Sequence, residues 1–454
     1  MRVLLVNPSQ VDLVQKRGRI YARRWTPLDL ATTAAWLEQD GVSADILDAN
    51  AEHLPPAEVA RRAAGFDKVF LTSTSLDRWQ CPHLDIGPFL ATAQALRQVA
   101  AELYVMGSHG TVKPAEMLAE TRATAIIRGE PEATVREICS GKPLEEVGGL
   151  TWKRGGETVH NPDQAPVRLE DAPLPAFEKL PMQRYEYEVL GDRFCLFEMT
   201  RGCASDCVFC LLKPYGVGVR TKSPAKLLSE VDHGVRNFGV RNAYFMDLEF
   251  TVIRRSVVEF CEGLIERAYD FEWCCQTRFD LVDDELLELM KRAGCRLIHF
   301  GVEAGSEEIL DWTNKKITMS QIEQGMALVQ AAGIESACFF VMGFPGAETK
   351  DMDDIYRFAR KLNPTYALFH VAAPYPGTEM YELVKNDPNV RFSDGSLFPE
   401  AVEGALDVRR LKRMTRMAYL RYYTRPTYLL SRLARGEFRA LARQANLFWQ
   451  FVRA

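Results

Sequence analysis

The sequence predicts an α/β protein with two successive regions of parallel sheet and a helical extension at its carboxyl end. Short apolar runs alternate with segments of helical periodicity over residues 1–140, and the alternation returns with longer helices from Arg193 to about Pro376. Strands that alternate with helices form parallel sheets covered on both faces. After Arg409 the apolar residues recur at helical spacing, with breaks expected at Pro426 and Gly436.

The composition is that of an ordinary globular protein of two to three domains. Of its 454 residues, 47% are hydrophobic and 26% are charged. No apolar run approaches the roughly 18 residues that span a bilayer, and Met1 leads directly into a strand-like run that leaves no room for a signal peptide. The eleven cysteines are odd in number and clustered, which suits metal binding in a reducing compartment better than a disulfide framework. We therefore expect a cytoplasmic protein.

Charge is distributed unevenly along the chain. The net charge is −5, yet residues 409–454 contain twelve Lys and Arg against one acid, Glu437. Residues 381–454 are therefore expected to form a basic, amphipathic helical region. Three roles are open for it: packing on the acidic body to close the active site, peripheral contact with an anionic membrane, or nucleic-acid binding. The arginines are spread at helical spacing rather than grouped in a module, so no nucleic-acid partner is expected.

The first region, residues 1–140, is expected to form a doubly covered parallel sheet. Its strand-like runs are 3–7, 44–47, 68–71, 103–106 and 125–127, and its helical patterns are 28–40, 57–64 and 89–101. A connector at 141–192 follows, with a hairpin turning at Gly155 and Gly156 and a Pro-rich boundary near 171–177.

Small and hydroxylated residues stand where the strands of this region end. Ligands of open parallel sheets bind at the carboxyl ends of the strands, and such residues let a large planar cofactor approach the backbone. Ordinary turn chemistry is the alternative explanation. The residues in question are Asn7, Pro8, Thr74, Ser75, Gly107, His109, Gly129 and Glu130.

Three cysteines, Cys203, Cys207 and Cys210, fall within eight residues after an apolar run and a glycine. A four-iron cluster asks for four thiolates, so three would leave one iron open for chemistry. A structural zinc site would need a fourth, suitably spaced Cys or His, which the scattered remainder does not offer. Buried unreactive thiols are rarely clustered in this way. An iron-sulfur cluster is thus the favoured interpretation.

Polar and Gly-Pro segments also follow the strand-like runs of residues 193–380, where a partial parallel barrel would place its functional loops. A zwitterionic ligand needs an anion for its ammonium group and a guanidinium for its carboxylate. Taken singly, each of these residues is equally well explained as a surface charge or a helix cap. They are Asp247, Glu249, Arg278, Glu303, Gly343 and Pro345.

The spacing Cys-x3-Cys-x2-Cys with Phe209 before the last cysteine resembles the radical S-adenosylmethionine (SAM) enzymes. The resemblance implies a partial (β/α)6 TIM-like barrel, a [4Fe-4S] cluster held by the three cysteines, and SAM, which is cleaved to a 5′-deoxyadenosyl radical. It also implies an external electron donor such as flavodoxin or ferredoxin. By this match, Asp247 or Glu249 would hold the amino group of SAM, and Arg278 its carboxylate. Glu303 would bind the ribose, with Gly343, Pro345 and Phe209 around the adenine.

The order of Thr26-Pro-Leu-Asp, the Gly107-x-His109 turn and residues 128–132 resembles the cobalamin-binding domain that precedes many radical SAM enzymes. The resemblance implies a Rossmann-like cobalamin-binding domain over residues 1–140. The Asp-x-His-x-x-Gly motif is missing, which implies a base-off cobalamin without a histidine ligand from that motif. His109 would line the side of the nucleotide tail or cap its loop, and Arg78 and Trp79 are among the candidates to lie under cobalt.

The expected activity is a cobalamin-dependent radical SAM methyltransferase acting on an unactivated carbon, or on phosphorus, of a small molecule. A Tyr-x-Arg-Pro pattern at 423–426 resembles relatives that act on apolar substrates and favours a hydrophobic one. Two alternatives keep the radical chemistry: cyclisation, ring contraction or oxidation with cobalamin, or transfer of another fragment of SAM. An iron-sulfur redox sensor is the alternative from another class.

Overall fold

The computed structural model describes residues 1–9, 24–216, 218–393, 396–434, 438 and 441. The chain divides into two compact units. The first comprises Met1–Gly202, Leu211–Met246 and Asp394–Leu397, and the second comprises Cys203–Cys210, Asp247–Ser393 and Phe398–Ala454. The helix break predicted at Gly436 lies outside the described residues.

A seven-stranded sheet organises the first unit, in the order β2-β1-β3-β4-β5-β6-β7. Its first five strands pair in parallel, which confirms the predicted α/β class. They are β1 (Arg2–Asn7), β2 (Ser43–Asp48), β3 (Lys68–Thr72), β4 (Glu102–Met106) and β5 (Ala125–Ile127).

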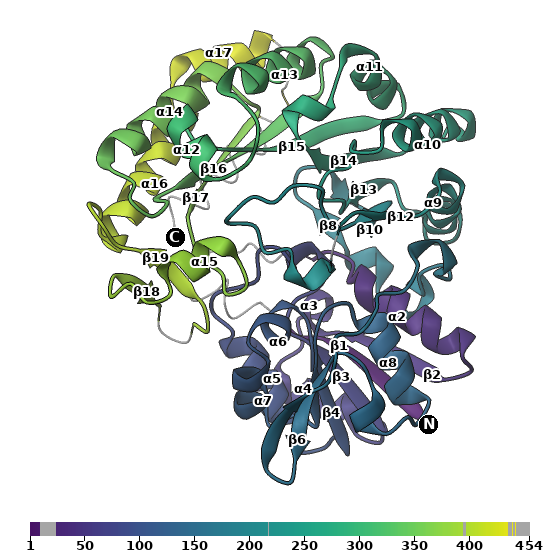
Figure 1. Cartoon of the computed structure of the whole chain (residues 1–454). Coiled ribbons are helices and arrows are strands. Elements are labelled where there is room, and N and C mark those ends of the chain that lie inside the picture. The colour runs from purple at the N-terminus through teal and green to yellow at the C-terminus, as the bar shows by residue number, and fades with distance from the viewer. Residues whose placement is uncertain (10–23, 217, 394–395, 435–437, 439–440, 442–454) are drawn as a thin grey trace. The chain divides into compact units, whose positions relative to one another are not determined.

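Helices cover both faces of this sheet (Figure 1). Because successive side chains of a strand point to opposite faces, Val3 and Leu5 of β1 pack with α2 (Leu28–Gln39) and α8 (Pro131–Cys139). Leu4 and Val6 pack on the other face, against α4 (Pro56–Ala63), α5 (Gly87–Leu96) and α7 (Pro114–Thr121). A strand buried on both faces explains the unbroken apolar run from Val3 to Val6.

The predicted hairpin is present as β6 (Leu150–Arg154) and β7 (Glu157–His160). Its first strand pairs antiparallel with β5. The sheet of the first unit therefore continues beyond residue 140 as far as His160, because the hairpin completes the hydrogen bonding of an edge that β5 would otherwise expose.

Six further parallel strands confirm the second predicted region. In the first unit β10 (Phe194–Phe197) pairs with β13 (Asn242–Phe245). In the second unit β14 (Glu272–Thr277), β15 (Cys295–Glu303), β16 (Glu335–Met342) and β17 (Tyr366–Val371) are parallel neighbours in that order. The helices that alternate with these strands are α9 (Pro224–Phe238), α10 (Arg254–Arg267), α11 (Asp284–Arg292), α12 (Glu307–Trp312), α13 (Met319–Ala331) and α14 (Thr349–Leu362).

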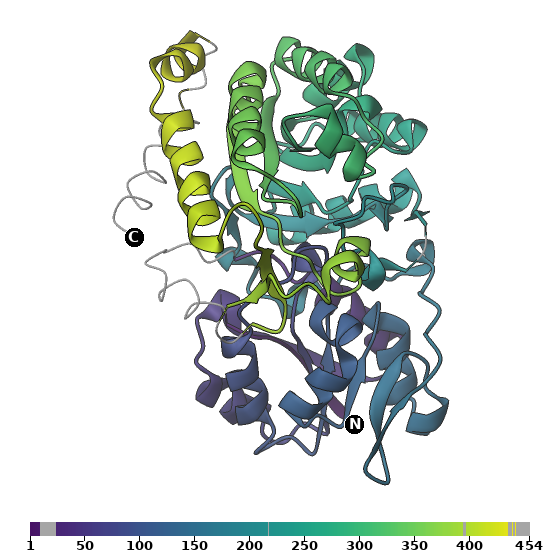
Figure 2. The same cartoon turned by 60° about the vertical axis from the view of Figure 1, so that its left-hand side comes forward.

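The basic tail forms α16 (Val408–Tyr423) and α17 (Pro426–Ala434), separated at the predicted Pro426. Figure 2 shows α16, in yellow, running along one side of the green part of the second unit. Tyrosine hydroxyls from these helices bond the backbone around β17: Tyr419 to the Phe369 amide, and Tyr423 to both the amide and the carbonyl of Ala367. The tail therefore covers a strand edge that would otherwise leave backbone groups unpaired. None of the helices in the described part of the chain could cross a membrane.

Candidate functional site

The cysteine loop is fixed by its backbone within the second unit. The Val208 amide donates to the Thr313 carbonyl at 3.1 Å, and the Val208 carbonyl accepts from the Met380 amide at 2.8 Å. Just before the loop, Gly202 has a φ of 95°, and a Cβ there would lie 2.0 Å from the Gly218 carbonyl oxygen. Only glycine fits at the entry to the loop.

Cys203, Cys207 and Cys210 form no disulfide, and all three are partly exposed. Seven of the other eight cysteines are buried, and Cys81 is exposed. Burial, with the Glu249 carboxylate as the next cause, raises the pKa of the Cys203 thiol to about 11. Burial also raises the pKa of Cys207. A metal that takes these sulfurs as thiolates must therefore displace their protons.

The donor set of the loop fits an iron-sulfur cluster rather than a single ion. Within the described ranges, no group of three or more His, Cys, Asp or Glu side chains is arranged to hold one metal ion. A cluster needs no such convergence, because each thiolate binds a separate iron. Three accessible thiols on one anchored loop supply that ligand type.

Glu249 and Arg278, each of which was predicted to follow a strand, meet beside the loop. The Glu249 carboxylate accepts from the Ala204 amide at 3.2 Å and from the Ser205 hydroxyl at 2.6 Å. Arg278 Nη1 donates to the same Ser205 oxygen at 3.2 Å, and Arg278 Nε lies 3.9 Å from Glu249 Oε1. The guanidinium also forms a two-pronged ion pair with Asp280. An anion and a cation thus lie next to Cys203, which is the pairing a zwitterion needs.

Glu303 belongs to β15 itself and not to the loop predicted after it, because that strand continues three residues beyond Phe300. Its carboxylate accepts from Lys315 Nζ at 2.9 Å, and both side chains are buried. The Glu303 carboxylate beside it keeps the pKa of the Lys315 ammonium raised even though burial lowers it. Lys315 was not predicted, because it follows a helix and not a strand.

The remaining predicted SAM residues occupy distinct environments in the second unit. The Phe209 ring lies 5.5 Å from that of Phe344, which in turn lies 5.4 Å from Trp312. Asp247 is fully buried, and Pro345 is half-buried. Gly343 has a φ of 80°, and a Cβ there would lie 2.8 Å from a methyl carbon of Leu411 on α16. The close approach of α16 therefore explains the glycine at position 343. Trp312 is a further aromatic neighbour, which the sequence analysis did not identify.

Two of the strand ends in the first unit are joined by hydrogen bonds. The Ser108 amide donates to Thr74 Oγ1 at 2.8 Å. Gly107 has a φ of 101°, and a Cβ would lie 2.7 Å from Ser73 Oγ and 2.8 Å from Thr74 Oγ1. Ser73 Oγ is buried and has no hydrogen-bond partner among the described residues. This tight, hydroxyl-lined turn fits a polar group of a ligand that approaches the backbone.

The other predicted residues of this region are engaged inside the protein. Asn7 donates its side-chain amide to Asp48 at 2.9 Å, and Pro8 beside it is buried. Ser75 donates to Asp77 at 2.5 Å. His109 is fully buried, with Nε2 2.7 Å from the His83 carbonyl oxygen. Burial lowers the pKa of His109 to about 4, so the imidazole is neutral near pH 7.

The two residues named as candidates to lie under cobalt differ in exposure. Trp79 is 1% exposed, and its ring lies 5.4 Å from that of Tyr215. The Arg78 side chain is 27% exposed and lies 3.8 Å from the Asp77 carboxylate.

Arg201, two residues before Cys203, is the centre of a buried ionic network that the sequence did not reveal. Its guanidinium lies 2.9 Å from Glu130, 2.8 Å from Glu132 and 3.2 Å, through Nε, from Glu198. Arg220 adds a second cation to Glu130. Gly129, just before, donates its amide to Thr111 Oγ1 at 2.9 Å. The predicted Gly129–Glu130 turn is thus tied to the strand that leads into the cysteine loop.

The buried carboxyl group of Asp29 lies in the same region. It accepts from the Leu76 amide at 3.4 Å. Burial, followed by the negative charge of Glu132, raises the pKa of Asp29 from its ordinary 3.8 to about 7. The folded protein therefore holds a proton here that the unfolded chain has already lost above about pH 4.

Because Asp29 holds this proton only in the folded state, we expect the free energy of unfolding to fall as the pH rises. Between about pH 4 and pH 7 the folded state binds one more proton at Asp29 than the unfolded state does, so the free energy of unfolding decreases by up to about 4 kcal/mol over that interval. Asp29→Asn should reduce this loss, measured as the difference in melting temperature between pH 5 and pH 8. Asp45→Asn, at an exposed carboxylate, is the control and should leave the difference unchanged. An unchanged difference in Asp29→Asn would contradict the assignment.

Comparison with known proteins agrees with this architecture. Residues 197–359 match the radical SAM superfamily. An uncharacterized methyltransferase of Pyrococcus horikoshii is 25% identical over 446 residues, which are 95% of this chain and 94% of that protein. The anaerobic magnesium-protoporphyrin IX monomethyl ester cyclase of Rubrivivax gelatinosus is 27% identical over 84% of this chain and 70% of its own.

A solved structure extends the likeness to the whole fold. The cobalamin-dependent SAM radical enzyme OxsB, solved with aqua-cobalamin and SAM bound, superposes with a TM-score of 0.72 over 92% of this chain and 66% of its own, at 17% identity. Residues 197–359 therefore form a radical SAM domain, and the chain as a whole shares its fold with cobalamin-dependent radical SAM enzymes.

Proposed function

We propose that this protein is a cobalamin-dependent radical SAM methyltransferase that methylates an unactivated carbon, or phosphorus, of a small hydrophobic molecule. The observation that carries the proposal is the anchored loop of three accessible cysteines with Glu249 and Arg278 beside it. The fold shared with OxsB and the whole-chain similarity to a methyltransferase support it.

The residues of the second unit divide into distinct tasks under this proposal. Cys203, Cys207 and Cys210 would hold a [4Fe-4S] cluster. Glu249 and Arg278 would orient the amino and carboxylate groups of SAM. When bound, the cluster and SAM supply a radical that removes a hydrogen atom, and cobalamin supplies the methyl group.

Neighbouring residues would position the nucleoside part of SAM and exclude water from it. The Glu303 carboxylate, held by Lys315, would accept from ribose hydroxyls. The aromatic side chains of Phe209, Phe344 and Trp312 pack in series and offer an apolar surface next to the loop. An apolar, desolvated surrounding keeps a reactive intermediate from water.

In the first unit, the hydroxyl-lined turn of Ser73, Thr74 and Gly107 would approach cobalamin, with Gly129 and Glu130 on the neighbouring strand end. An external electron donor such as flavodoxin or ferredoxin completes the proposal. Reductive cleavage of SAM consumes one electron, which such a donor would supply.

Isotope transfer tests this function directly. With SAM labelled in its methyl group, we expect labelled product only when the protein carries both the cluster and cobalamin. Turnover without cobalamin would overturn the proposal. A product whose mass lacks the added methyl group would favour a cyclisation or oxidation, a second candidate that the similarity to the magnesium-protoporphyrin cyclase supports.

A further inference from the structure

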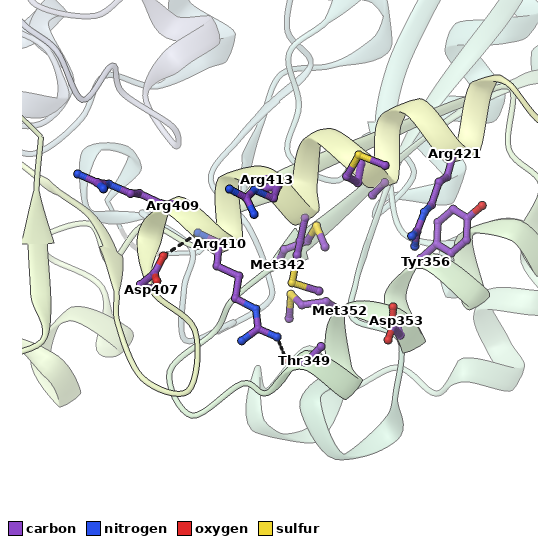
Figure 3. A pocket seen from close by; sticks show the side chains of 13 residues that line it. Met342, Thr349, Met352, Asp353, Tyr356, Asp407, Arg409, Arg410, Arg413 and Arg421 are labelled. Carbon is purple, nitrogen blue, oxygen red and sulfur yellow. Dashed lines mark hydrogen bonds between the residues drawn. The ribbon is translucent and has the colours of Figure 1, made fainter.

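A pocket of about 530 Å³ opens between α14 and α16 in the second unit (Figure 3). None of the residues that line it belongs to the cysteine loop or to the SAM residues predicted above. Arginine and methionine dominate its walls. Its walls include Met342 of β16, Thr349 and Met352 of α14, Asp407, and Arg409, Arg410, Arg413, Met414, Met417 and Arg421 of α16.

Along the pocket, one face of α16 carries arginines at its two ends and methionines between them. Arg410, Met414, Met417 and Arg421 recur at the spacing of a single helical face. The two arginines stand about 16 Å apart along the helix axis, and sulfur atoms lie between them in Figure 3. The Met417 side chain is 39% exposed. The wall is thus cationic at its ends and apolar in the middle.

The floor of the pocket is apolar and adaptable. Met342 and Met352 are 1% and 2% exposed, so they belong to the packed interior beneath the opening. Unbranched thioether side chains fill irregular gaps and repack around ligands at small cost. A flexible hydrocarbon chain could therefore lie against this floor without a rearrangement of the helices.

The cations of the pocket have not been neutralised by the protein. Among the described residues, the guanidinium groups of Arg409, Arg410, Arg413 and Arg421, which all line the pocket, form no ion pair with a carboxylate. Arg410 Nη2 reaches only the neutral Thr349 hydroxyl, at 3.2 Å. Of the two acids in the lining, Asp407 is the amino-terminal cap of α16 and accepts from the Arg410 amide at 2.7 Å. The other, Asp353 of α14, forms no ion pair with these arginines in the described part of the chain. Clustered guanidinium groups of this kind favour a multivalent anion.

We propose that this pocket binds one phosphate-bearing amphiphile. Arg410 and Arg413, near the start of α16, hold the phosphate, and the apolar chain lies along Met414 and Met417 over Met352. The site is additional to the methyl-transfer function, because its residues are separate from those assigned to the cluster and SAM. The phosphate can come from a soluble metabolite or from a lipid headgroup.

Calorimetric titration of the purified full-length protein with monomeric dodecyl phosphate tests the site. We expect saturable binding of one molecule per protein, weakened roughly 100-fold or more in Arg410→Gln/Arg413→Gln, because two charge-assisted contacts to the phosphate are lost. Inorganic phosphate lacks the hydrocarbon tail, and dodecyl maltoside lacks the negative charge. Each should bind at least roughly 10-fold more weakly than dodecyl phosphate. The exposed Arg292→Gln on α11 is the matched control and should bind as the wild type does.

A second arm distinguishes the two sources of phosphate. Sedimentation with phosphatidylcholine vesicles that contain phosphatidylglycerol, retained by the wild type and lost in the double variant, would identify a lipid headgroup. Dodecyl phosphate binding without retention on vesicles would identify a soluble amphiphile. The proposal is overturned if dodecyl phosphate fails to bind, or if the double variant, with an unchanged melting temperature, binds it equally well.

Discussion

Replacing Cys207 by alanine is expected to yield a folded protein that no longer holds iron. Cys207 is partly exposed, and its loop is anchored by backbone hydrogen bonds that the substitution leaves in place. A cluster that loses one of three protein thiolates has too few ligands to persist. We expect iron and sulfide to fall from about four atoms each per chain towards zero, and 5′-deoxyadenosine formation to fall by roughly 1,000-fold or more, about 4 kcal/mol in the activation free energy.

The matched control for this variant is Cys81→Ser, at an exposed cysteine outside the loop, which should keep its iron. Iron and sulfide analysis after anaerobic reconstitution measures the cluster content, and circular dichroism shows whether the variant is folded. Full iron content in Cys207→Ala would contradict the assignment of the loop. Loss of iron with retained methyl transfer would instead contradict the radical mechanism.

Replacing Arg201 by methionine is expected to lower the free energy of unfolding more than replacing Cys207 or Arg220 does. The Arg201 side chain is 1% exposed and neutralises Glu130, Glu132 and Glu198, which are all buried. Removing one partner from a buried ionic network leaves uncompensated charges and costs about 3–5 kcal/mol. For a unit of this size we expect the melting temperature to fall by roughly 6–20 °C.

Two further variants distinguish the effect of the lost positive charge from the effect of lost side-chain packing. Arg220→Met removes a partly exposed cation from Glu130 while Arg201 remains, so its effect should be smaller. Adding Glu132→Gln and Glu198→Gln to Arg201→Met removes two of the stranded charges and should restore much of the stability. If the triple variant melts no higher than Arg201→Met, the loss is due to packing and the electrostatic explanation is wrong.

The network also bears on the cysteine loop. Arg201 directly precedes Gly202, whose backbone admits no side chain, and Cys203 follows. Because Arg201 holds this strand to the Gly129–Glu130 turn, its loss would loosen the start of the loop. Iron content of Arg201→Met, measured well below its melting temperature, would show whether the network positions the cluster ligands as well as stabilising the fold.

The sequence determined much of the architecture because its signals are local. The alternation of short apolar runs, such as Val3 to Val6, with helical segments predicted strands covered on both faces, and both faces of this strand are indeed covered. The prediction of helices broken at Pro426 held because proline cannot continue a preceding helix. The cysteine spacing likewise pointed to its chemistry without a structure, because three ligands on one short loop need no distant partner.

Only the tertiary structure revealed interactions between residues far apart in the chain. Lys315 meets Glu303 and Arg201 meets Glu130, and neither pairing has a sequence spacing that predicts it. The tail shows the same division. The sequence predicted its helical period. The hydrogen bonds that the β17 amides donate to the Tyr419 and Tyr423 hydroxyls, and the arginine-lined pocket, depend on how α16 packs against its neighbours. Local patterns fix which elements form, whereas burial and charge pairing depend on packing between elements.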